Sequence, residues 1–258
     1  MESLFKVEDV TFAYGEKPVL RHLNLEIKAG KITTIMGANG CGKSTLFSIM
    51  TKNLKPLGGR VMLKDHDIAD LSLKSYAKEV AIVHQYNVAP DDLTVEKLVG
   101  YGRTPYRKIG GSLDSNLDEE MVERAMKITG VFAFKDRYVS ELSGGQRQRV
   151  WIAMALAQGT DTIFLDEPTT YLDIRYQLQL LHLIKGLNTK YKTTIIMVLH
   201  DINQALTYSD EIIALSPNGE LVAQGNPKDV VSTDSLRKMY GIDLEVTSVN
   251  GNPFVITV

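Results

Sequence analysis

The sequence contains a single cysteine and few aromatic residues, and its charges of opposite sign nearly cancel. Of the 258 residues, 7% are Phe, Trp or Tyr. A lone cysteine, Cys41, cannot form an internal disulfide, which fits a protein of a reducing compartment. With 29 Lys and Arg against 31 Asp and Glu, the formal net charge is −2. This balance argues against a chain that binds nucleic acid mainly by neutralising phosphates.

Long apolar segments are also missing. The longest uninterrupted apolar run covers residues 150–157, whereas a membrane-spanning helix needs ~20 apolar residues. Residues 1–6 have neither the basic start nor the apolar centre of a signal peptide. We therefore expect a chain that neither spans a membrane nor is exported by a signal peptide. Its length favours one large α/β domain, or one domain with an inserted subdomain.

Short apolar runs rich in β-branched residues alternate with longer amphipathic segments. This alternation is typical of parallel strands joined by crossover helices. Residues 5–14 and 24–27 lack a helix-length segment between them, so they predict an antiparallel pair that precedes the parallel sheet. The predicted parallel strands are residues 32–36, 80–83, 163–166 and 194–199, and the predicted helices are 43–51, 118–129, 146–157 and 174–189.

The strand pattern disappears between residues 94 and 159, over a distance too long for a structureless loop in a compact domain. We interpret residues 94–159 as a helical subdomain inserted into an α/β core of residues 1–93 and 160–240. Asn250-Gly251 between two apolar runs predicts a β-hairpin in the tail, residues 241–258. The expected fold is a single α/β domain over residues 1–258, with a mostly parallel sheet and an antiparallel lead-in sheet.

A glycine-rich motif follows the predicted strand at residues 32–36. Its spacing is G-x-x-x-x-G-K-[ST], and its residues are Gly37, Ala38, Asn39, Gly40, Cys41, Gly42, Lys43, Ser44 and Thr45. Glycines let successive backbone N–H groups point at phosphate oxygens, and the following helix adds the positive end of its dipole. Lys43 supplies a charge for the β- and γ-phosphates, and the Ser44 hydroxyl can bind Mg²⁺. A chance glycine-rich turn is the alternative, but the position between a strand and a helix favours a P-loop nucleotide site.

Cys41 lies inside this loop. One interpretation is a small side chain at an unconstrained position. A thiol beside Lys43 and a helix N-terminus should, however, have a lowered pKa. In that case alkylation would inactivate the protein, and bound nucleotide would slow the reaction.

Polar residues follow three further predicted strands. Asp166 and Glu167 end one strand, Gln85 follows another and His200 follows a third. Ligands bind beyond the carboxyl ends of parallel strands. We assign Asp166 to the Mg²⁺ shell and Glu167 to the attacking water, which it orients or deprotonates. His200 can contact the γ-phosphate, and Gln85 can join the metal or the water; the alternative is that the acids cap helices and His200 bonds a backbone carbonyl.

A second glycine-rich segment, Leu142-Ser143-Gly144-Gly145-Gln146, precedes the predicted helix at residues 146–157. Ser143 and Gln146 have the spacing of a capping box. Two glycines in the first turn lower the stability of the helix. A simple helix cap does not need these glycines, whereas a backbone that closely approaches a phosphate does. This segment has no lysine of its own. It can therefore complete a nucleotide site begun elsewhere, in this chain or in a second copy.

Taken in order, the phosphate loop, residues 142–146, residues 163–167 and His200 resemble the ATP-hydrolysing subunit of ATP-binding-cassette (ABC) transporters. The resemblance covers residue 4 to about residue 225, and it implies ATP and Mg²⁺ as cofactors. It implies that Tyr14 stacks on adenine, although Tyr14 could equally be a strand-end residue. It also implies a head-to-tail dimer, in which one copy binds the γ-phosphate of the ATP held by the other. The residues that bind this phosphate would be Ser143, Gly144, Gly145 and Gln146.

The same resemblance implies further partners. Gln85 would act as the switch toward an integral membrane permease dimer, which receives cargo from a substrate-binding protein. Residues 171–173 would cross the dimer interface, where the family more often begins with Ser or Ala than with Tyr171. The chain would then lie at the cytoplasmic face of the inner membrane as a peripheral subunit, without nucleic acid as a partner.

The segment Gly100-Tyr101-Gly102-Arg103-Thr104-Pro105 resembles the ATPases of bacterial importers for iron–siderophore complexes, haem and cobalamin, as do residues 169–173 and 240–243. Without that resemblance, its glycines and proline are typical of a surface loop. The resemblance implies an ATPase that powers uptake of a metal chelate, with an iron–siderophore complex favoured. The alternatives are haem or cobalamin import, export, a soluble ABC protein acting on nucleic acid, and a phosphoryl-transfer kinase. The last leaves residues 142–146 unexplained.

Overall fold

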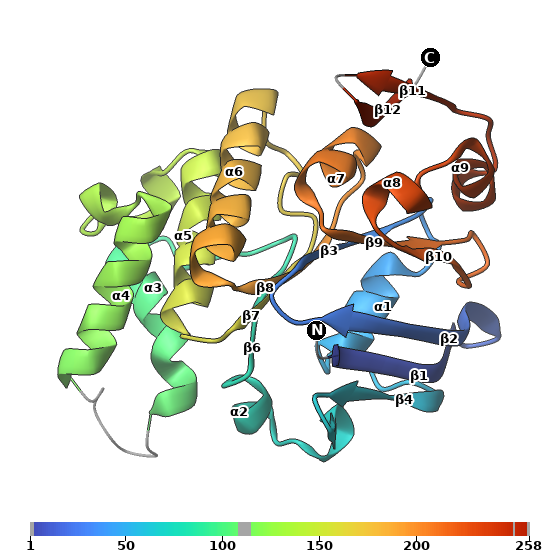
Figure 1. The fold of residues 1–258 in the computed structure, drawn as a ribbon. Coiled ribbons are helices and arrows are strands. Elements are labelled where there is room, and N and C mark those ends of the chain that lie inside the picture. The colour runs from blue at the N-terminus through green and yellow to red at the C-terminus, as the bar shows by residue number, and fades with distance from the viewer. Residues whose placement is uncertain (1–2, 108–114, 250, 257–258) are drawn as a thin grey trace. The chain divides into compact units, whose positions relative to one another are not determined.

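The chain is described by a computed structural model that covers residues 3–107, 115–249 and 251–256 (Figure 1). It forms two compact units. The first unit comprises Met1–Leu71 and Lys192–Val258, and the second comprises Ser72–Tyr191. The second unit contains the helical segment predicted at residues 94–159 together with two strands and a long helix that pack with it.

An antiparallel sheet lies in the first unit. Its strand order is β2-β1-β4-β5, with β1 (Ser3–Tyr14), β2 (Lys17–Lys28), β4 (Gly58–Leu63) and β5 (His66–Asp67). The predicted antiparallel pairing of the first two strands is confirmed, with Val7 opposite Leu25. Strand β2 begins earlier than predicted, and its buried residues Leu20 and Leu23 lie three apart because the pairing with β1 shifts register between them.

Three parallel strands form the centre of the first unit. Strand β3 (Ile32–Met36) pairs with β8 (Thr194–Val198) on one side and with β9 (Glu211–Leu215) on the other. Every residue of these three strands is buried, so the strands show no alternation of apolar and polar residues; the enclosed residues include Thr33, Thr34 and Glu211. Strand β10 (Leu221–Gly225) adds to β9 in the antiparallel direction.

The helices of the first unit are short. They are η1 (Ile68–Asp70), α1 (Lys43–Met50), α7 (Ile202–Tyr208), α8 (Pro227–Val230) and α9 (Thr233–Tyr240). Helices α8 and α9 pack beside β9 and β10 (Figure 1). The hairpin of β11 (Glu245–Val249) and β12 (Asn252–Ile256) follows. It is tied to α7 by Asn203, whose side chain exchanges two hydrogen bonds with the backbone of Val255.

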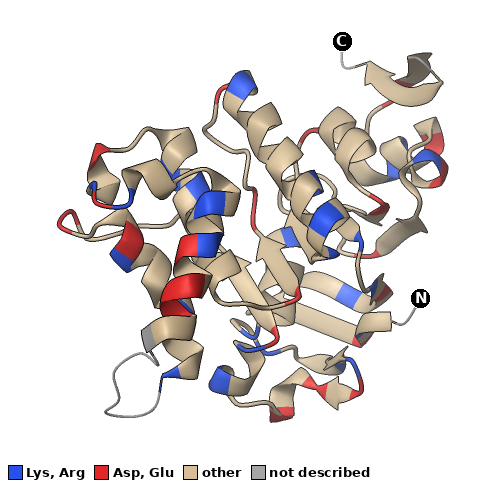
Figure 2. Cartoon of the chain, turned by 60° about the vertical axis from the view of Figure 1, so that its left-hand side comes forward, with Lys and Arg blue, Asp and Glu red and all other residues tan. Residues whose placement is uncertain are grey.

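The second unit contains one parallel strand pair and most of the helical structure. Strand β6 (Val80–Val83) pairs with β7 (Thr162–Leu165). The helices are α2 (Leu73–Tyr76), α3 (Val95–Gly100), η2 (Tyr101–Tyr106), α4 (Ser115–Thr129), η3 (Phe132–Phe134), η4 (Val139–Glu141), α5 (Gly144–Ala157) and α6 (Ile174–Tyr191). Acidic and basic residues lie side by side on these helices (Figure 2), as in the ion pair of Glu123 and Lys127.

The Gly-Arg-x-Pro segment is part of the helical core. Arg103 is 5% exposed, and its Nε donates to Oδ1 of Asp118 at 2.6 Å. Its Nη1 donates to the carbonyl oxygens of Ala157 and Gln158 at the end of α5, at 3.0 and 3.1 Å. A Cβ on Gly102 would lie 2.1 Å from the carbonyl oxygen of Met154. The glycine therefore permits the approach of η2 to α5, and the arginine joins three helices, so the surface-loop interpretation is wrong.

Within the described residues, no helix combines the length and the apolar character that a membrane crossing requires.

Candidate functional site

The segment between β3 and α1 forms a tight loop in the first unit. Gly37, Gly40 and Gly42 have φ angles of 148°, 77° and 104°, a region that L side chains rarely adopt. A Cβ on Gly37 would lie 2.6 Å from Sγ of Cys41 and 2.7 Å from the carbonyl oxygen of Leu215. A Cβ on Gly40 would meet no described atom within 4 Å. Close packing therefore requires glycine at position 37, whereas at position 40 the backbone conformation favours it and the surrounding space is open.

Lys43 begins helix α1 and turns back onto the loop. Its side chain is nearly buried, and its ammonium donates to the carbonyl oxygens of Gly37 at 2.9 Å and Ala38 at 3.0 Å. Among the described residues, no side-chain hydrogen bond caps this helix, whose N-cap is Gly42. An uncapped helix N-terminus beside a buried ammonium is suited to bind an anion. Ser44 is exposed in the first turn.

The Cys41 side chain is 1% exposed. Burial raises the pKa of its thiol, and the opposing effect of the Lys43 charge is smaller. The predicted lowering of this pKa is therefore wrong. The sequence places the thiol beside a lysine correctly, but desolvation outweighs that charge once the side chain is enclosed.

Tyr14 and His200 also belong to the first unit. Tyr14 ends β1, is 56% exposed, and meets the ring of Phe12 edge-on at a centroid distance of 5.0 Å. His200 follows β8 and is exposed. Because β3 and β8 are adjacent and parallel, the phosphate loop and His200 leave the sheet at the same edge.

In the second unit, the loops after β6 and β7 bring two predicted residues into contact. Nε2 of Gln85 donates to Oε2 of Glu167 at 2.5 Å, and Oγ1 of Thr170 donates to the same oxygen at 3.2 Å. Asp166 continues the strand pairing through its N–H, which donates to the carbonyl oxygen of Val83 at 2.9 Å. Glu167 has a φ of 45°, so the backbone turns sharply at the acid.

The start of α5 has the predicted capping box. The N–H of Ser143 donates to Oε1 of Gln146 at 3.0 Å, and the N–H of Gln146 donates to Oγ of Ser143 at 3.4 Å. A Cβ on Gly145 would lie 2.8 Å from the ring of Tyr176, whereas the nearest described side chain to a Cβ on Gly144 would be 3.8 Å away. Gly145 is thus required by packing against Tyr176, which the sequence does not show, whereas a Cβ on Gly144 would make only an ordinary van der Waals contact.

Two residues of these loops were not predicted from the sequence: Thr170, which donates to Glu167, and Tyr86. The hydroxyls of Tyr86 and Tyr171 are 2.7 Å apart, one residue beyond the Gln85–Glu167 contact along the first loop. Tyr86 follows Gln85 in the sequence and Thr170 precedes Tyr171, and these positions could have drawn attention to both residues. The pairing of Tyr86 with Tyr171 could not be anticipated, because it depends on how the loops after two adjacent strands meet.

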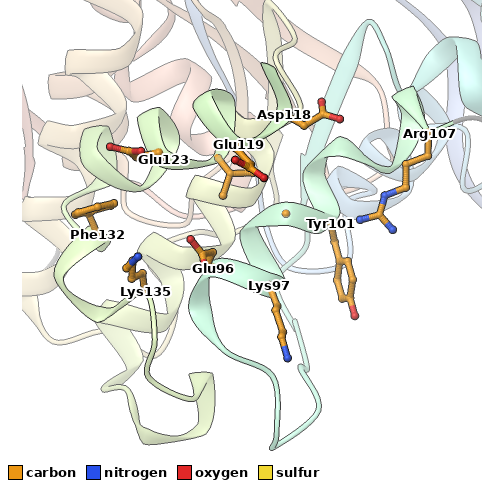
Figure 3. A pocket seen from close by; sticks show the side chains of 11 residues that line it. Glu96, Lys97, Tyr101, Arg107, Asp118, Glu119, Glu123, Phe132 and Lys135 are labelled. Atoms are coloured by element: carbon orange, nitrogen blue, oxygen red, sulfur yellow. The ribbon is translucent and has the colours of Figure 1, made fainter. Parts of the chain in front are cut away.

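A separate cavity of about 530 Å³ lies between α3 and α4 (Figure 3). Its lining mixes acids such as Glu96 and Glu119 with the bases Lys97 and Lys135, and it contains no predicted nucleotide-site residue. In the part of the chain that the structure describes, no three His, Cys, Asp or Glu residues gather as a metal-binding cluster.

Comparisons with known sequences and structures identify similar proteins that are ABC transporter ATP-binding subunits. Residues 20–170 match the ABC transporter family. The chain is 43% identical over 258 residues to a petrobactin import ATP-binding protein of Bacillus anthracis, which covers 99% of this chain and 94% of that protein. It is also 43% identical over 248 residues to the iron(3+)-hydroxamate import ATP-binding protein of Bacillus subtilis (strain 168), with 96% and 91% covered.

A solved structure agrees with this result. A dimeric bacterial ABC transporter cassette is 31% identical, covers 86% of this chain and 98% of its own, and superposes with a TM-score of 0.74. The same cassette has also been solved in a post-hydrolysis state bound to ADP and Pi. This chain therefore belongs to the ABC transporter family, as one of its ATP-hydrolysing subunits.

Proposed function

We propose that this chain powers the uptake of an iron–siderophore complex through a separate membrane permease. The observation that carries the proposal is 43% identity, over nearly the whole chain, to the petrobactin and iron(3+)-hydroxamate import proteins. The resemblance of the Gly-Arg-x-Pro segment to the same importer ATPases also supports it. Substrate contacts are not expected in an ATPase subunit, so the relatives supply the inference about cargo.

In this proposal the residues of the first unit bind ATP. In the structure Lys43 donates to two neutral carbonyl oxygens, and phosphate oxygens would replace them with stronger, charge-assisted partners. The backbone N–H groups of residues 37–45 would hold the phosphates, and the exposed ring of Tyr14 would stack on adenine. His200, at the same sheet edge, would contact the γ-phosphate.

The oxygen ligands on this chain fit Mg²⁺. Ser44 supplies a hydroxyl in the first turn of α1 and Asp166 a carboxylate after β7, and both are hard donors of the kind Mg²⁺ prefers. Held by these two residues, Mg²⁺ would supply positive charge that offsets the negative charge of the phosphates. Gln85 would join the metal shell or the attacking water.

Glu167 is the proposed general base. Its carboxylate would orient or deprotonate the attacking water. In the structure Gln85 and Thr170 both donate to Oε2 of Glu167, which fixes the direction of the carboxylate. This hydrogen bond supports a role for Gln85 as the link between the hydrolytic site and a permease.

The start of α5 is proposed to act on a second copy of the chain. In the capping box the Ser143 hydroxyl serves as an acceptor, so its O–H proton can be donated to a γ-phosphate. Gly144, Gly145 and Gln146 would add backbone and side-chain donors. The dimeric relative supports self-association of the chain, and the proposed dimer is head to tail with two shared ATP sites. The assembly would sit at the cytoplasmic face of the inner membrane, where the permease dimer receives cargo from a binding protein.

Reconstitution tests this function. The chain is used to isolate its permease from solubilised membranes, and the complex is placed in vesicles with the matching binding protein. We expect ATP-dependent uptake of radiolabelled ferric siderophore, and loss of uptake with Glu167→Gln. Uptake of haem or cobalamin instead, or export of any of these compounds, would contradict the assignment of cargo.

A further inference from the structure

Two loops of the second unit are joined by a pair of tyrosines. Tyr86 lies in the loop after β6 and Tyr171 in the loop after β7, and their hydroxyls are 2.7 Å apart. The ring centroids are 6.0 Å apart with an interplanar angle of 43°. The two residues are 69% and 79% exposed. Burial therefore contributes little to the pairing, and the hydroxyl–hydroxyl hydrogen bond is its specific contact.

Tyr171 adopts a backbone conformation that is unfavourable for a tyrosine. Its φ is 63°, in the left-handed region. Such a conformation persists where surrounding contacts determine it. The N–H of Leu172 donates to the carbonyl oxygen of Thr169 at 3.3 Å, and the N–H of Thr170 to that of Glu167 at 3.2 Å. The bond to Tyr86 adds a link from outside the loop.

This tyrosine pair lies beside the catalytic contact. Gln85 donates to Glu167 across the same two loops. The two links, Gln85–Glu167 and Tyr86–Tyr171, therefore run between the same loops one residue apart on the β6 side. An ABC subunit with Ser or Ala at position 171 could not span this distance, since its side chain is too short to reach Tyr86.

We propose that Tyr86 and Tyr171 form a clasp that positions Gln85 against the Glu167 carboxylate for water attack. The inference rests on the proposed role of Glu167 as general base. Neither tyrosine touches the reacting atoms; both are positioning residues that act through Gln85. Restricting the motion of the β6 loop would keep the Glu167 carboxylate in one direction, and a fixed catalytic group lowers the barrier to reaction.

The surroundings make removal of one hydroxyl a clean test. A cavity of about 670 Å³ adjoins the pair and is also lined by Arg147, Gln148 and Trp151. Phenylalanine would retain the ring without forcing repacking. The hydrogen bond to Tyr171 raises the pKa of Tyr86 above its usual value, so Tyr86 keeps its proton throughout the neutral range.

The experiment compares Tyr171→Phe, Tyr86→Phe and the double variant in the ATP-hydrolysing complex with permease. We expect kcat to fall about threefold to tenfold in each single variant, the range for loss of one neutral hydrogen bond. KM for ATP should stay within about twofold, and the double variant should be no slower than either single variant. Tyr191→Phe is the matched control, because Tyr191 contacts Arg124 and Lys190 through its ring face, which phenylalanine retains; its kcat should be unchanged.

Three outcomes would overturn the clasp: an unchanged kcat in Tyr171→Phe, a rise in KM alone, or single-variant effects that multiply in the double variant. A second readout needs no activity. Hydrogen–deuterium exchange at residues 84–88 and 166–172 of the complex should be faster in Tyr171→Phe than in the wild type, and equal rates would also overturn the clasp. Absence of ATP hydrolysis in the wild type would instead contradict the proposed function, and the exchange measurement would still decide the clasp.

Discussion

Two glycine-rich segments begin helices in this chain, and they satisfy their hydrogen bonds in different ways. Before α1, among the described residues, no side-chain cap is formed, and Lys43 donates to the loop's own carbonyls. Before α5, Ser143 and Gln146 bond each other's backbone N–H groups in a complete capping box. The first segment is prepared for an anion within its own unit, whereas the second is already a stable helix start.

The glycines of the two segments differ in the same way. Gly37 and Gly42 have positive φ angles, so their backbone conformation itself favours glycine. Gly145 lies in a helix and is required by the ring of Tyr176. The comparison shows that similar glycine-rich motifs can reflect backbone shape in one place and side-chain packing in another. Each difference can be tested separately.

Lys43→Ala should have the largest effect. Removing the ammonium deletes the charge proposed to bind the β- and γ-phosphates, so ATP hydrolysis should fall by about 10²–10³-fold. Steady-state phosphate release measures it. Lys55→Ala, which removes an exposed lysine of the same unit, should retain wild-type activity. A Lys43→Ala protein within about tenfold of wild type would remove the basis for treating the first segment as the anion site.

Gly145→Ala should destabilise the protein by about 1–3 kcal/mol, because a methyl group would collide with the Tyr176 ring. Urea unfolding of the purified chain measures the free energy. The double variant with Tyr176→Ala should show little additional loss relative to Tyr176→Ala alone. Additive losses would mean that Gly145 is needed for a reason other than this contact.

Cys41 should react slowly with iodoacetamide. Its raised pKa leaves less thiolate than an ordinary thiol has at neutral pH, and burial limits access. We expect a rate at least about tenfold below that of free cysteine at neutral pH, rising as the pH is raised toward the thiol pKa. Mass spectrometry follows the modification, and a rate equal to that of free cysteine would show that the loop exposes the thiol.

Gly144→Ala should have the smallest effect on stability. The position lies in the first turn of α5, and an added Cβ would come no nearer than 3.8 Å to its neighbour, so alanine should stabilise the helix by about 0.5–1 kcal/mol. The same urea measurement tests this. A loss as large as that of Gly145→Ala would erase the distinction between the two glycines.

The sequence predicts best those features that are local. The parallel strands are short and mostly apolar runs, and the phosphate loop and the capping box are defined by the spacing of a few neighbours. Arg103 shows the limit: its bonds to Asp118 and to the carbonyls of Ala157 and Gln158 depend on three helices meeting. The prediction for the Cys41 pKa is wrong for the same reason, because the pKa depends on how the fold encloses the thiol.

The start of α5 is proposed to complete a nucleotide site on a second copy of the chain. Light scattering of the Glu167→Gln chain with ATP tests it most directly, with Ser143→Arg added in a second sample. We predict that the mass doubles with ATP in the first sample and stays that of one chain in the second. A Glu167→Gln chain that remains monomeric with ATP, or a Ser143→Arg chain that dimerises equally well, would contradict the account.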